Sequence, residues 1–353
     1  MKIAQLVSGI YSVSDKSSHA IYSHVAWLCN GLTDKKHQVE LFASGDSKTK
    51  AKLNSVYLKS FNKTKLNENL IKYYTFLLNS NCYSKANNFD IIHSHFTIVN
   101  LFFTKLTSTP SIQSIHSPIT NDQKEILKHF KSNRFISFSL AQRKSMPELN
   151  WIANIYHGVD MDIFSYNSKP KDYFLYLGRI TKEKGVHYAI EAAKAAKVPL
   201  ILAGRSYSNE GYWHEKIEKQ IDGKNIKYVG ELNFKDKIEY IRNAKALIFP
   251  TQYTYEVFGY VMIEAMACGT PVIGWKNGSV PEIISDKKTG YVVNSINEMI
   301  QAIKDINKIK REDVRKRAER YFSIKKMVSG YEKIYKRIID ENKINQDKKN
   351  NRL

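Results

Sequence analysis

The stretch Glu256-Val-Phe-Gly-Tyr-Val-Met-Ile-Glu-Ala-Met-Ala-Cys-Gly-Thr-Pro-Val-Ile-Gly274 decides how this chain folds. Good helix formers fill its middle, and the Gly-Thr-Pro at 269–271 ends the helix before a short apolar strand. The N-terminus of such a helix presents unpaired backbone N–H groups, which bind an anion well. Two carboxylates, Glu256 and Glu264, flank that point, and carboxylates accept hydrogen bonds from sugar hydroxyls. An anion flanked by hydroxyl groups describes a nucleotide sugar.

Strand-like and helix-like segments alternate along the rest of the chain. Apolar runs predict strands at 3–7, 39–43, 89–93, 111–115 and 135–138, and again at 173–178, 200–203, 226–229, 246–249 and 272–274. Apolar residues spaced three or four apart predict helices at 20–32, 67–86, 185–196, 212–221 and 235–243. The alternation predicts an α/β protein with two Rossmann-like domains, each a parallel sheet wrapped by helices, that face an interdomain cleft.

The composition bounds the class of protein. With 353 residues, of which 42% are hydrophobic, the chain is long enough for two domains that each bury a core. Three widely spaced cysteines without metal-ligand spacing indicate a reduced, cytoplasmic compartment. The apolar run at 1–7 is too short for a signal peptide, and no run reaches the roughly 20 apolar residues of a membrane span.

The net charge of +21, from 55 basic and 34 acidic residues, leaves two interpretations open. The charge favours peripheral contact with an anionic membrane surface, or it reflects a lysine-rich composition spread along the chain. Nucleic acid is not an expected partner, because the chain has no zinc-finger spacing and no aromatic–glycine RNA-binding motif. Lys124, Lys128, Lys131 and Arg134 fall near a predicted helix that would face the cleft or a membrane.

The two carboxylates and their surroundings resemble a known signature. The spacing from Glu256 to Glu264 is similar to the Glu-x7-Glu motif of the retaining glycosyltransferase family 4, which has the GT-B fold. The blocks at 278–284 and 289–293 also resemble that family, and the chain departs from it mildly in having Val257 where Pro is usual. The resemblance implies an acceptor-side domain at 1–160, a nucleotide-sugar-binding domain at 161–322, and a C-terminal helix at 323–353 that crosses back to the first domain and frays into a basic coil.

The resemblance assigns the donor site to the second domain. Arg179 and Lys184, in a block similar to the family's Gly-Arg and Lys-Gly element, would bind the diphosphate, since a guanidinium fork and an ammonium both suit it. Glu264 would bind the ribose hydroxyls and Glu256 the transferred sugar. The remaining expected donor contacts are backbone groups of Phe258, Gly259, Tyr260 and Val261, a base pocket beside Gly204-Arg205 and Gly230-Glu231-Leu232, and a sugar pocket shaped by Tyr253-Thr254-Tyr255.

Histidines carry the resemblance into the first domain. His116 falls where the family places an active-site histidine that contacts the donor sugar. His93 and His95 fit its His-x-His pattern, and we interpret them as cleft-lining or structural because the sequence offers no convincing third ligand for a metal. His19 and Ala20 stand where relatives carry two glycines, so their Cβ atoms would crowd close approach by a ligand, while His19 would add a donor of its own.

The chain is therefore expected to be an enzyme of the hexosyl-type glycosyltransferase class. It would move a sugar from a nucleotide-diphosphate sugar, with UDP-sugar favoured, to a hydroxyl of a lipid-linked or cell-surface glycan in polysaccharide biosynthesis. Catalysis would use His116, Arg179, Lys184 and Glu256, retain the anomeric configuration by a front-face mechanism, and need neither cofactor nor metal. The Asp-x-Asp at 160–162 is interpreted as linker, with Asp160 tying it by hydrogen bonds. Two alternatives are a nucleotide-sugar epimerase of similar shape and a non-catalytic nucleotide-sugar-binding subunit.

Overall fold

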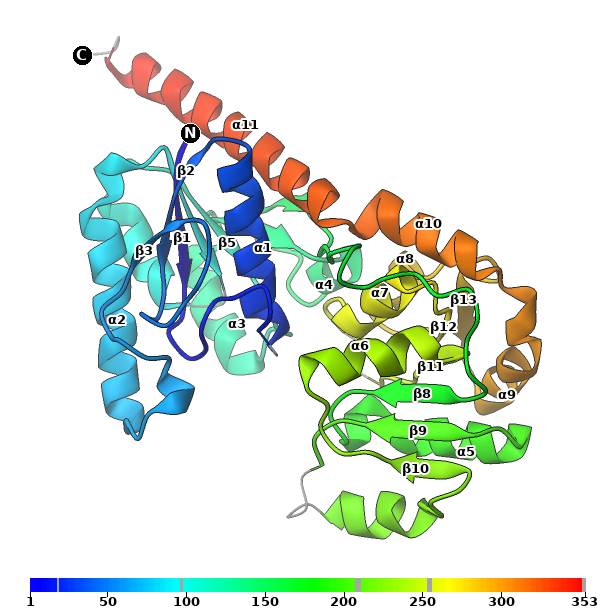
Figure 1. Ribbon diagram of the computed structural model, residues 1–353. Helices are drawn as coiled ribbons and strands as arrows, with labels where there is room; N and C mark the ends of the chain where they lie inside the picture. Colours follow the sequence, from blue (N-terminus) through cyan, green and yellow to red (C-terminus); the bar gives the residue numbers. More distant parts are fainter. Residues whose placement is uncertain (18, 96–97, 207–210, 253–255, 351–353) are drawn as a thin grey trace. The chain divides into compact units, whose positions relative to one another are not determined.

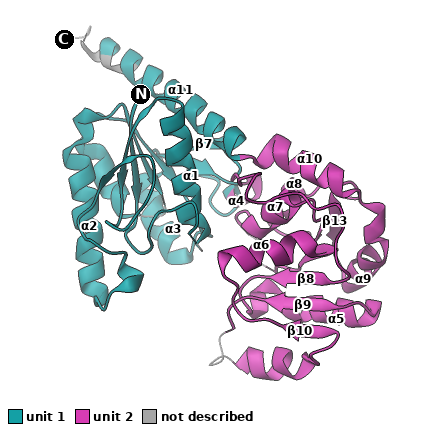
Figure 2. Ribbon diagram, in the orientation of Figure 1, with its two compact units in different colours: residues 1–138, 143–156, 324–353 teal, residues 139–142, 157–323 magenta. Residues whose placement is uncertain are grey.

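The computed structural model describes residues 1–17, 19–95, 98–206, 211–252 and 256–350. The chain forms two compact units, coloured separately in Figure 2. Unit 1 contains residues 1–138, 143–156 and 324–353, and unit 2 contains residues 139–142 and 157–323. The chain thus passes between the units after residues 138, 142, 156 and 323, whereas the sequence analysis expected boundaries at 160 and 322.

Unit 1 is built on a seven-stranded sheet in which every strand pairs in parallel. Its spatial order is β3-β2-β1-β4-β5-β6-β7, with bounds β1 Lys2–Val7, β2 Gln38–Phe42, β3 Lys52–Asn54, β4 Ile91–His95, β5 Ser111–Ser114, β6 Arg134–Ser137 and β7 Trp151–Asn154. The order reverses between β1 and β4, and that switch point is where ligands bind in open parallel sheets. Strands β3 and β7, at the two edges, were not predicted from the sequence, because each is short and only partly buried.

Helices cover both faces of this sheet (Figure 1). The helices of unit 1 are α1 Ala20–Asp34, α2 Glu68–Ser84, α3 Asn121–Leu127 and α11 Ile324–Asn350. Helix α11 packs against α1; the Val328 side chain lies so close to Gly31 that a Cβ there would come within 2.6 Å of it. The end of α11 corrects an expectation, because the helix continues through Asn350 where coil was predicted.

Unit 2 repeats the same design with six parallel strands. Their order is β10-β9-β8-β11-β12-β13, with bounds β8 Phe174–Leu177, β9 Leu200–Ala203, β10 Ile226–Tyr228, β11 Ala246–Phe249, β12 Val272–Trp275 and β13 Gly290–Val293. This is the 3-2-1-4-5-6 order of a doubly wound dinucleotide-binding sheet, with its switch point between β8 and β11. The sequence predicted five of these strands, and β13 lies in the block at 289–293 that resembles the family.

The helices of unit 2 form two groups, in which α5 contacts α9, and α7 contacts α6 and α10. Their bounds are α5 Val186–Ala196, α6 Phe234–Asn243, α7 Tyr260–Ala267, α8 Val280–Ile283, α9 Ile296–Asp305 and α10 Arg311–Phe322, and α4 Leu140–Arg143 lies at the unit boundary. The regular helix predicted at 212–221 was wrong in detail. A π-helix at Trp213–Ile217 runs into a 3-10 helix at Glu218–Gln220, a difference that apolar spacing does not reveal.

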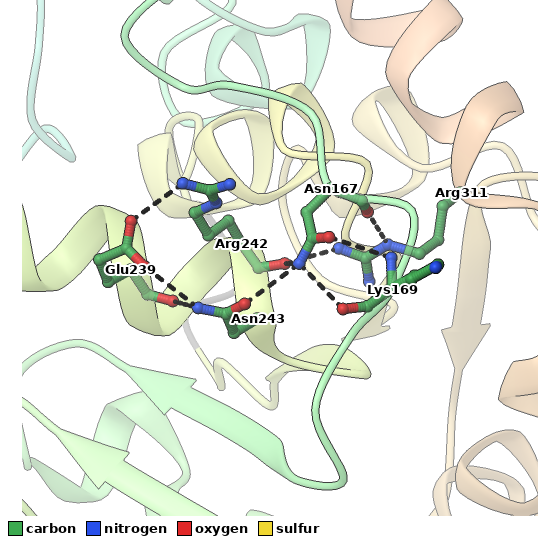
Figure 3. Close-up of polar contacts among 6 residues, drawn as sticks. All are labelled: Asn167, Lys169, Glu239, Arg242, Asn243 and Arg311. Carbon is green, nitrogen blue, oxygen red and sulfur yellow. Dashed lines mark hydrogen bonds and ion pairs between the residues drawn. The ribbon is translucent and has the colours of Figure 1, made fainter.

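A partly buried polar cluster ties α6 and α10 of unit 2 to the chain that enters the unit (Figure 3). The Arg311 guanidinium donates to the backbone carbonyls of Asn167 at 2.6 Å and Arg242 at 2.9 Å. The Asn167 amide donates to Asn243 Oδ1 at 3.1 Å, and the Asn243 amide donates to the Glu239 carbonyl at 2.9 Å. Burial lowers the pKa of Arg311 to about 10, so the group stays charged and holds α6 in place.

No described helix is long and apolar enough to cross a membrane, as the sequence predicted.

Candidate functional site

The candidate site of unit 2 lies at its topological switch point. Strands β8 and β11 are neighbours there, with Phe174 opposite Ala246 and Leu175 opposite Leu247. Both strands end at the same edge of the sheet, because parallel strands share a direction. Arg179 and Lys184 follow β8, and Glu256 follows β11. The fold therefore gathers the predicted diphosphate-binding and sugar-binding residues at the edge where such sheets bind ligands.

Lys184 and Glu256 form an ion pair at this edge. Lys184 Nζ lies 2.5 Å from Glu256 Oε2, and the Thr251 hydroxyl donates to the same oxygen at 3.1 Å. The two side chains of the ion pair are 18% and 12% exposed, so the pair is partly withdrawn from water but open to a ligand. The sequence predicted both residues separately, but it did not predict that they pair.

Two glycines shape the loops that carry this pair. Gly185 follows Lys184 with φ +69°, and a Cβ there would lie 2.0 Å from the Pro250 carbonyl oxygen. A Cβ at Gly278 would lie 2.5 Å from the backbone of Glu256. The next residue, Ser279, donates from its backbone to the Glu256 carbonyl at 3.1 Å and from its hydroxyl to the Phe258 carbonyl at 2.8 Å. The Gly-Ser at 278–279 therefore braces the loop that presents Glu256.

Glu264, in the middle of α7, is held by a residue that the sequence analysis missed. Lys237 of α6 places Nζ 2.6 Å from Glu264 Oε1, with the two side chains 21% and 9% exposed. The Lys237 ammonium also lies 5.5 Å from the ring centre of Phe164 and 5.2 Å from that of Phe234, a geometry that favours a cation. Both carboxylates of the motif are thus paired with a lysine. Nothing in the motif spacing points to Lys237.

Arg179 is exposed two residues beyond the end of β8, and its backbone is fixed from within the sheet. The Tyr176 hydroxyl donates to the Arg179 carbonyl at 2.7 Å. Burial raises the pKa of Tyr176 well above its ordinary value, and the charges of Arg179 and Glu256 act on it in opposite directions. Arg179 and Glu256 therefore both lie near enough to Tyr176 to act on its pKa, which agrees with the two residues belonging to one site.

The other predicted donor contacts occupy varied positions in unit 2. Gly204 follows the last residue of β9, and its N–H donates to the Gly230 carbonyl at 2.8 Å. Glu231 is exposed and forms no ion pair with any residue that the structure describes. Gly259 is the N-cap of α7, and the helix begins at Tyr260-Val261 without an acidic residue in its first turn. The Phe258 side chain is buried, so only its backbone is available to a ligand. The predicted sugar-pocket residues 253–255 lie outside the described residues.

In unit 1, His116 belongs to a chain of buried hydrogen bonds. His116 Nε2 lies 3.0 Å from His95 Nδ1, and His95 Nε2 lies 2.8 Å from Gln5 Oε1. The Gln5 amide donates to the Tyr335 hydroxyl at 3.0 Å, which lies 2.6 Å from His93 Nδ1. Because Gln5 Oε1 can only accept, His95 donates to it through Nε2. A neutral His95 then accepts at Nδ1, so His116 carries its hydrogen on Nε2.

Tyr335 lies on α11, so the last helix of the chain holds the histidines of the first sheet. Burial lowers the pKa of His93 and of His116 well below the ordinary value, and the neighbouring imidazole of His24 lowers both further. The pKa of His24 falls to about 3, again through burial. These rings are therefore neutral hydrogen-bonding groups at physiological pH. The interpretation of His93 and His95 as structural agrees with this network.

The structure groups three imidazoles, but not around the pair singled out from the sequence. Ring nitrogens of His24, His95 and His116 all lie within 4.8 Å of one another, and His93 is not part of this group. Both ring nitrogens of His95 already take part in the hydrogen bonds to Gln5 and His116. A metal ion in this cluster would have to break the bond between His95 and His116. The expectation that catalysis needs no metal stays a prediction.

The departure at His19 and Ala20 does not strain the fold. Helix α1 begins at Ala20, and His19 is its N-cap with φ −100°, a conformation open to any residue. The His19 ring stacks on Tyr11 with 4.6 Å between ring centres. Burial lowers the pKa of His19, so the ring is a neutral aromatic surface at the start of the helix.

Asp160 behaves as predicted for a linker residue. Its Oδ1 accepts from the backbone N–H groups of Asp162 at 2.9 Å and Ile163 at 3.1 Å. This hydrogen bonding confirms that the aspartate ties the chain locally.

The predicted basic face of unit 1 is less uniform than expected. Lys124 lies on α3, Lys128 and Lys131 lie in and after a 3-10 helix, and Arg134 begins β6. Lys128 is paired with Glu125 at 2.7 Å. A small hollow of about 50 Å³ lies beside His116, with the polar side chains of Gln113, Ser117 and Gln123 and three aliphatic residues in its wall.

Comparisons with known proteins agree with this geometry. A model of the glycosyl transferases group 1 family matches residues 160–324, and a model of glycosyltransferase family 4 matches residues 23–163. The chain is a glycosyltransferase of the family 4 type. Because both family models describe glycosyltransferases, the comparisons favour a transferase over the epimerase alternative.

Individual proteins support the same conclusion. An uncharacterized glycosyltransferase of Methanocaldococcus jannaschii is 27% identical over 282 residues, covering 72% of this chain and 78% of the relative. The O-antigen chain mannosyltransferase C of Escherichia coli is 22% identical over 289 residues, covering 72% and 76%. The crystal structure of Anabaena HepE in complex with UDP has a TM-score of 0.70 at 16% identity, covering 95% of this chain and 99% of that one. The predicted α/β class and GT-B fold are confirmed.

Proposed function

We propose that the enzyme transfers a hexosyl group from a nucleotide-diphosphate sugar to a hydroxyl acceptor with retention of configuration. The observation that carries the proposal is the pair of lysine–carboxylate contacts in unit 2. Lys184 meets Glu256 at 2.5 Å and Lys237 meets Glu264 at 2.6 Å. Each contact joins a cation suited to phosphate with a carboxylate suited to hydroxyl groups. A ligand that alternates sugar, diphosphate and ribose matches this alternation of charge.

In this proposal the cations act on the leaving group. The bond between the anomeric carbon and the diphosphate oxygen breaks, and Lys184 and Arg179 stabilise the negative charge that develops on the diphosphate. The acceptor oxygen attacks the same face of the sugar, and its proton passes to a diphosphate oxygen. Glu256 orients the transferred sugar and Glu264 the ribose, so neither carboxylate acts as nucleophile or general acid. His116 keeps its implied contact with the transferred sugar.

The proposed donor and acceptor draw on the relatives. Because HepE was crystallised with UDP, we favour a UDP-sugar as donor. Because one relative is an O-antigen chain mannosyltransferase, we favour a lipid-linked or cell-surface glycan as acceptor, made on the cytoplasmic side of a membrane that the basic protein contacts peripherally.

The first test is a thermal-shift panel with UDP, GDP, ADP and their sugar conjugates on the wild-type protein. At 100 times its dissociation constant, a ligand stabilises the fold by about 2.7 kcal/mol. We expect a shift with UDP that is lost in Glu264→Ala. The control is Glu312→Ala, which removes an exposed carboxylate of α10 and should keep the shift. A folded protein that responds to no nucleotide would refute the proposed donor site, while a shift without sugar transfer would favour the non-catalytic nucleotide-sugar-binding alternative.

The retaining mechanism has its own test. Proton NMR of the transfer product reports the configuration at the anomeric carbon of the new glycosidic bond. A donor whose diphosphate is axial at the anomeric carbon should give a product whose glycosidic bond is also axial. A product with the opposite configuration would refute the front-face mechanism but not the proposed binding of the donor.

A further inference from the structure

A second charged hollow lies in unit 2, on residues that the donor site does not use. It has a volume of about 470 Å³. Three segments form its wall: the loop before β13, the 3-10 helix at Ile306–Lys308 with the residues after it, and α10 (the strand and helix are labelled in Figure 1). Seven of its eleven lining residues are cations, namely Lys287, Lys288, Lys308, Lys310, Lys316, Arg317 and Arg320.

The charge in this hollow exceeds what the composition of the chain explains. Basic residues make up 55 of 353 in the whole chain, about one in six, against seven of eleven here. Asp313 is the single acidic residue among those that line it. Carboxylates outside the lining pair with two of the cations, Asp305 with Lys308 at 2.8 Å and Glu312 with Lys316 at 2.6 Å. The lining as a whole therefore carries a strong net positive charge, which favours an anionic ligand.

The wall of the hollow is fixed by hydrogen bonds. Arg317 donates through Nε to the Ile283 carbonyl at 2.7 Å and through Nη2 to the Glu282 carbonyl at 2.9 Å. The guanidinium groups of Arg317 and Arg320 lie 5.1 and 5.2 Å from the ring centre of Tyr321. These contacts order two of the cations before any ligand arrives, which lowers the entropic cost of binding.

The opposite wall is a tight turn that orients two lysines. The Lys287 backbone N–H donates to the Gly290 carbonyl at 2.8 Å, and the Thr289 backbone N–H donates to the Ser285 carbonyl at 2.9 Å. Lys287 and Lys288 are exposed at the tip of this turn, while Thr289 is buried beneath them. The cations that line the hollow are therefore carried by hydrogen-bonded segments of unit 2.

We propose that this hollow is a binding site for a ligand that carries more than one phosphate group. Ammonium and guanidinium groups are the side chains that bind phosphate oxygens, and several of them around one concavity suit several phosphates. The phosphates can belong to lipid headgroups at a membrane surface or to a molecule in solution. Binding of such a ligand would give a role to part of the net charge of +21, which the proposed transferase reaction does not require. The proposal does not depend on the identity of the donor or the acceptor.

The test uses the full chain and a triple variant, Lys287→Gln, Lys288→Gln and Arg320→Gln. One arm measures co-sedimentation at low salt with phosphatidylcholine vesicles, with and without phosphatidylglycerol. The other arm measures binding of inorganic tripolyphosphate by calorimetry. Each cation near an anionic surface contributes about five-fold in affinity at low salt, so the triple variant should bind roughly 100-fold more weakly. Unchanged unfolding temperatures would show that the variant keeps its fold.

The matched control removes the same charge from exposed positions of unit 1 outside the predicted basic face, in Lys59→Gln, Lys65→Gln and Lys72→Gln. We expect this control to bind as the wild type does. Loss of vesicle binding in the first variant alone assigns the lipid headgroup as ligand, and loss of tripolyphosphate binding alone assigns a soluble one. Equal losses in both variants, a loss confined to the control, or no binding by the wild type to either probe would overturn the proposal.

Discussion

The ion pair between Lys237 and Glu264 offers a quantitative test of how unit 2 holds its donor-binding carboxylate. We consider Lys237→Met, Glu264→Met and the double variant, since methionine fills similar space without charge. An exposed pair on α10, Lys316 with Glu312, has the same 2.6 Å separation but side chains 65% and 66% exposed, against 21% and 9% for the buried pair. The two pairs therefore differ in burial and not in distance.

Burial sets the expected magnitude. A hydrogen bond to a charged group contributes about 1.5–3 kcal/mol, and a charge left unpaired in a buried position costs more than that gain. Each single variant of the buried pair should therefore lower the free energy of unfolding by about 3 kcal/mol. The double variant leaves no unpaired charge and should lie within about 1 kcal/mol of the wild type, so the coupling energy should be about 5 kcal/mol. The exposed pair should show a much smaller coupling energy, because water and salt screen the attraction between its charges.

The assay is urea unfolding of all four proteins in each cycle, followed by circular dichroism, with unchanged m-values required for the comparison. The same proteins are then tested with UDP. Because Glu264 is proposed to bind ribose, the double variant should be nearly as stable as the wild type and still lack the UDP-dependent shift. A coupling energy for the buried pair no larger than that of the exposed pair would refute the reasoning.

Three further predictions concern other parts of the chain. Tyr335→Phe removes the hydroxyl that bonds Gln5 at 3.0 Å and a histidine at 2.6 Å, so the free energy of unfolding in urea should fall by about 2 kcal/mol. The two contacts of the Tyr331 hydroxyl are both 3.4 Å long. Tyr331→Phe should therefore lower the free energy of unfolding by only about 1 kcal/mol or less. The depressed pKa of His24, about 3, means that the unfolded chain binds a proton below pH 6.5 while the folded one does not. Stability should therefore fall as pH drops from 6.5 toward 3, by about 1.4 kcal/mol per pH unit for this group. If the stability of His24→Gln fell just as steeply with pH, this reasoning would be contradicted. Gly185→Ala places a Cβ against a carbonyl oxygen and should cost at least twice the roughly 1 kcal/mol of Gly223→Ala, which has the same positive φ but nothing within 4 Å; equal melting temperatures would count against the steric argument.

Much of the fold was predictable because its signals are local. Apolar runs bounded by glycine and proline gave most strands to within two residues, and the three-to-four spacing gave α1 Ala20–Asp34 and α5 Val186–Ala196 almost to their ends. The failures occurred where the local signal is weak. The edge strand Lys52–Asn54 has no continuous apolar run, and the π-helix at Trp213–Ile217 differs from an α-helix only in hydrogen bonding.

The motif also gave the main residues of the candidate site, because Glu256 and Glu264 lie on one short segment. The long-range partners of the site residues could not be predicted in this way. Lys237 lies 27 positions before Glu264, and Tyr335 lies 242 positions after His93. Pairs of this kind form only after the sheet order and the helix packing have brought distant segments together, so no spacing in the sequence reveals them.

The sequence by itself thus determined the elements, the α/β class and the carboxylate motif, since hydrophobic periodicity and helix signals act over a few neighbouring residues. The tertiary structure alone decided which charges neutralise one another, which way His116 carries its hydrogen, and where seven cations converge on one hollow. These properties depend on distances and burial between remote residues, and electrostatic energies follow distance and burial and not position along the chain.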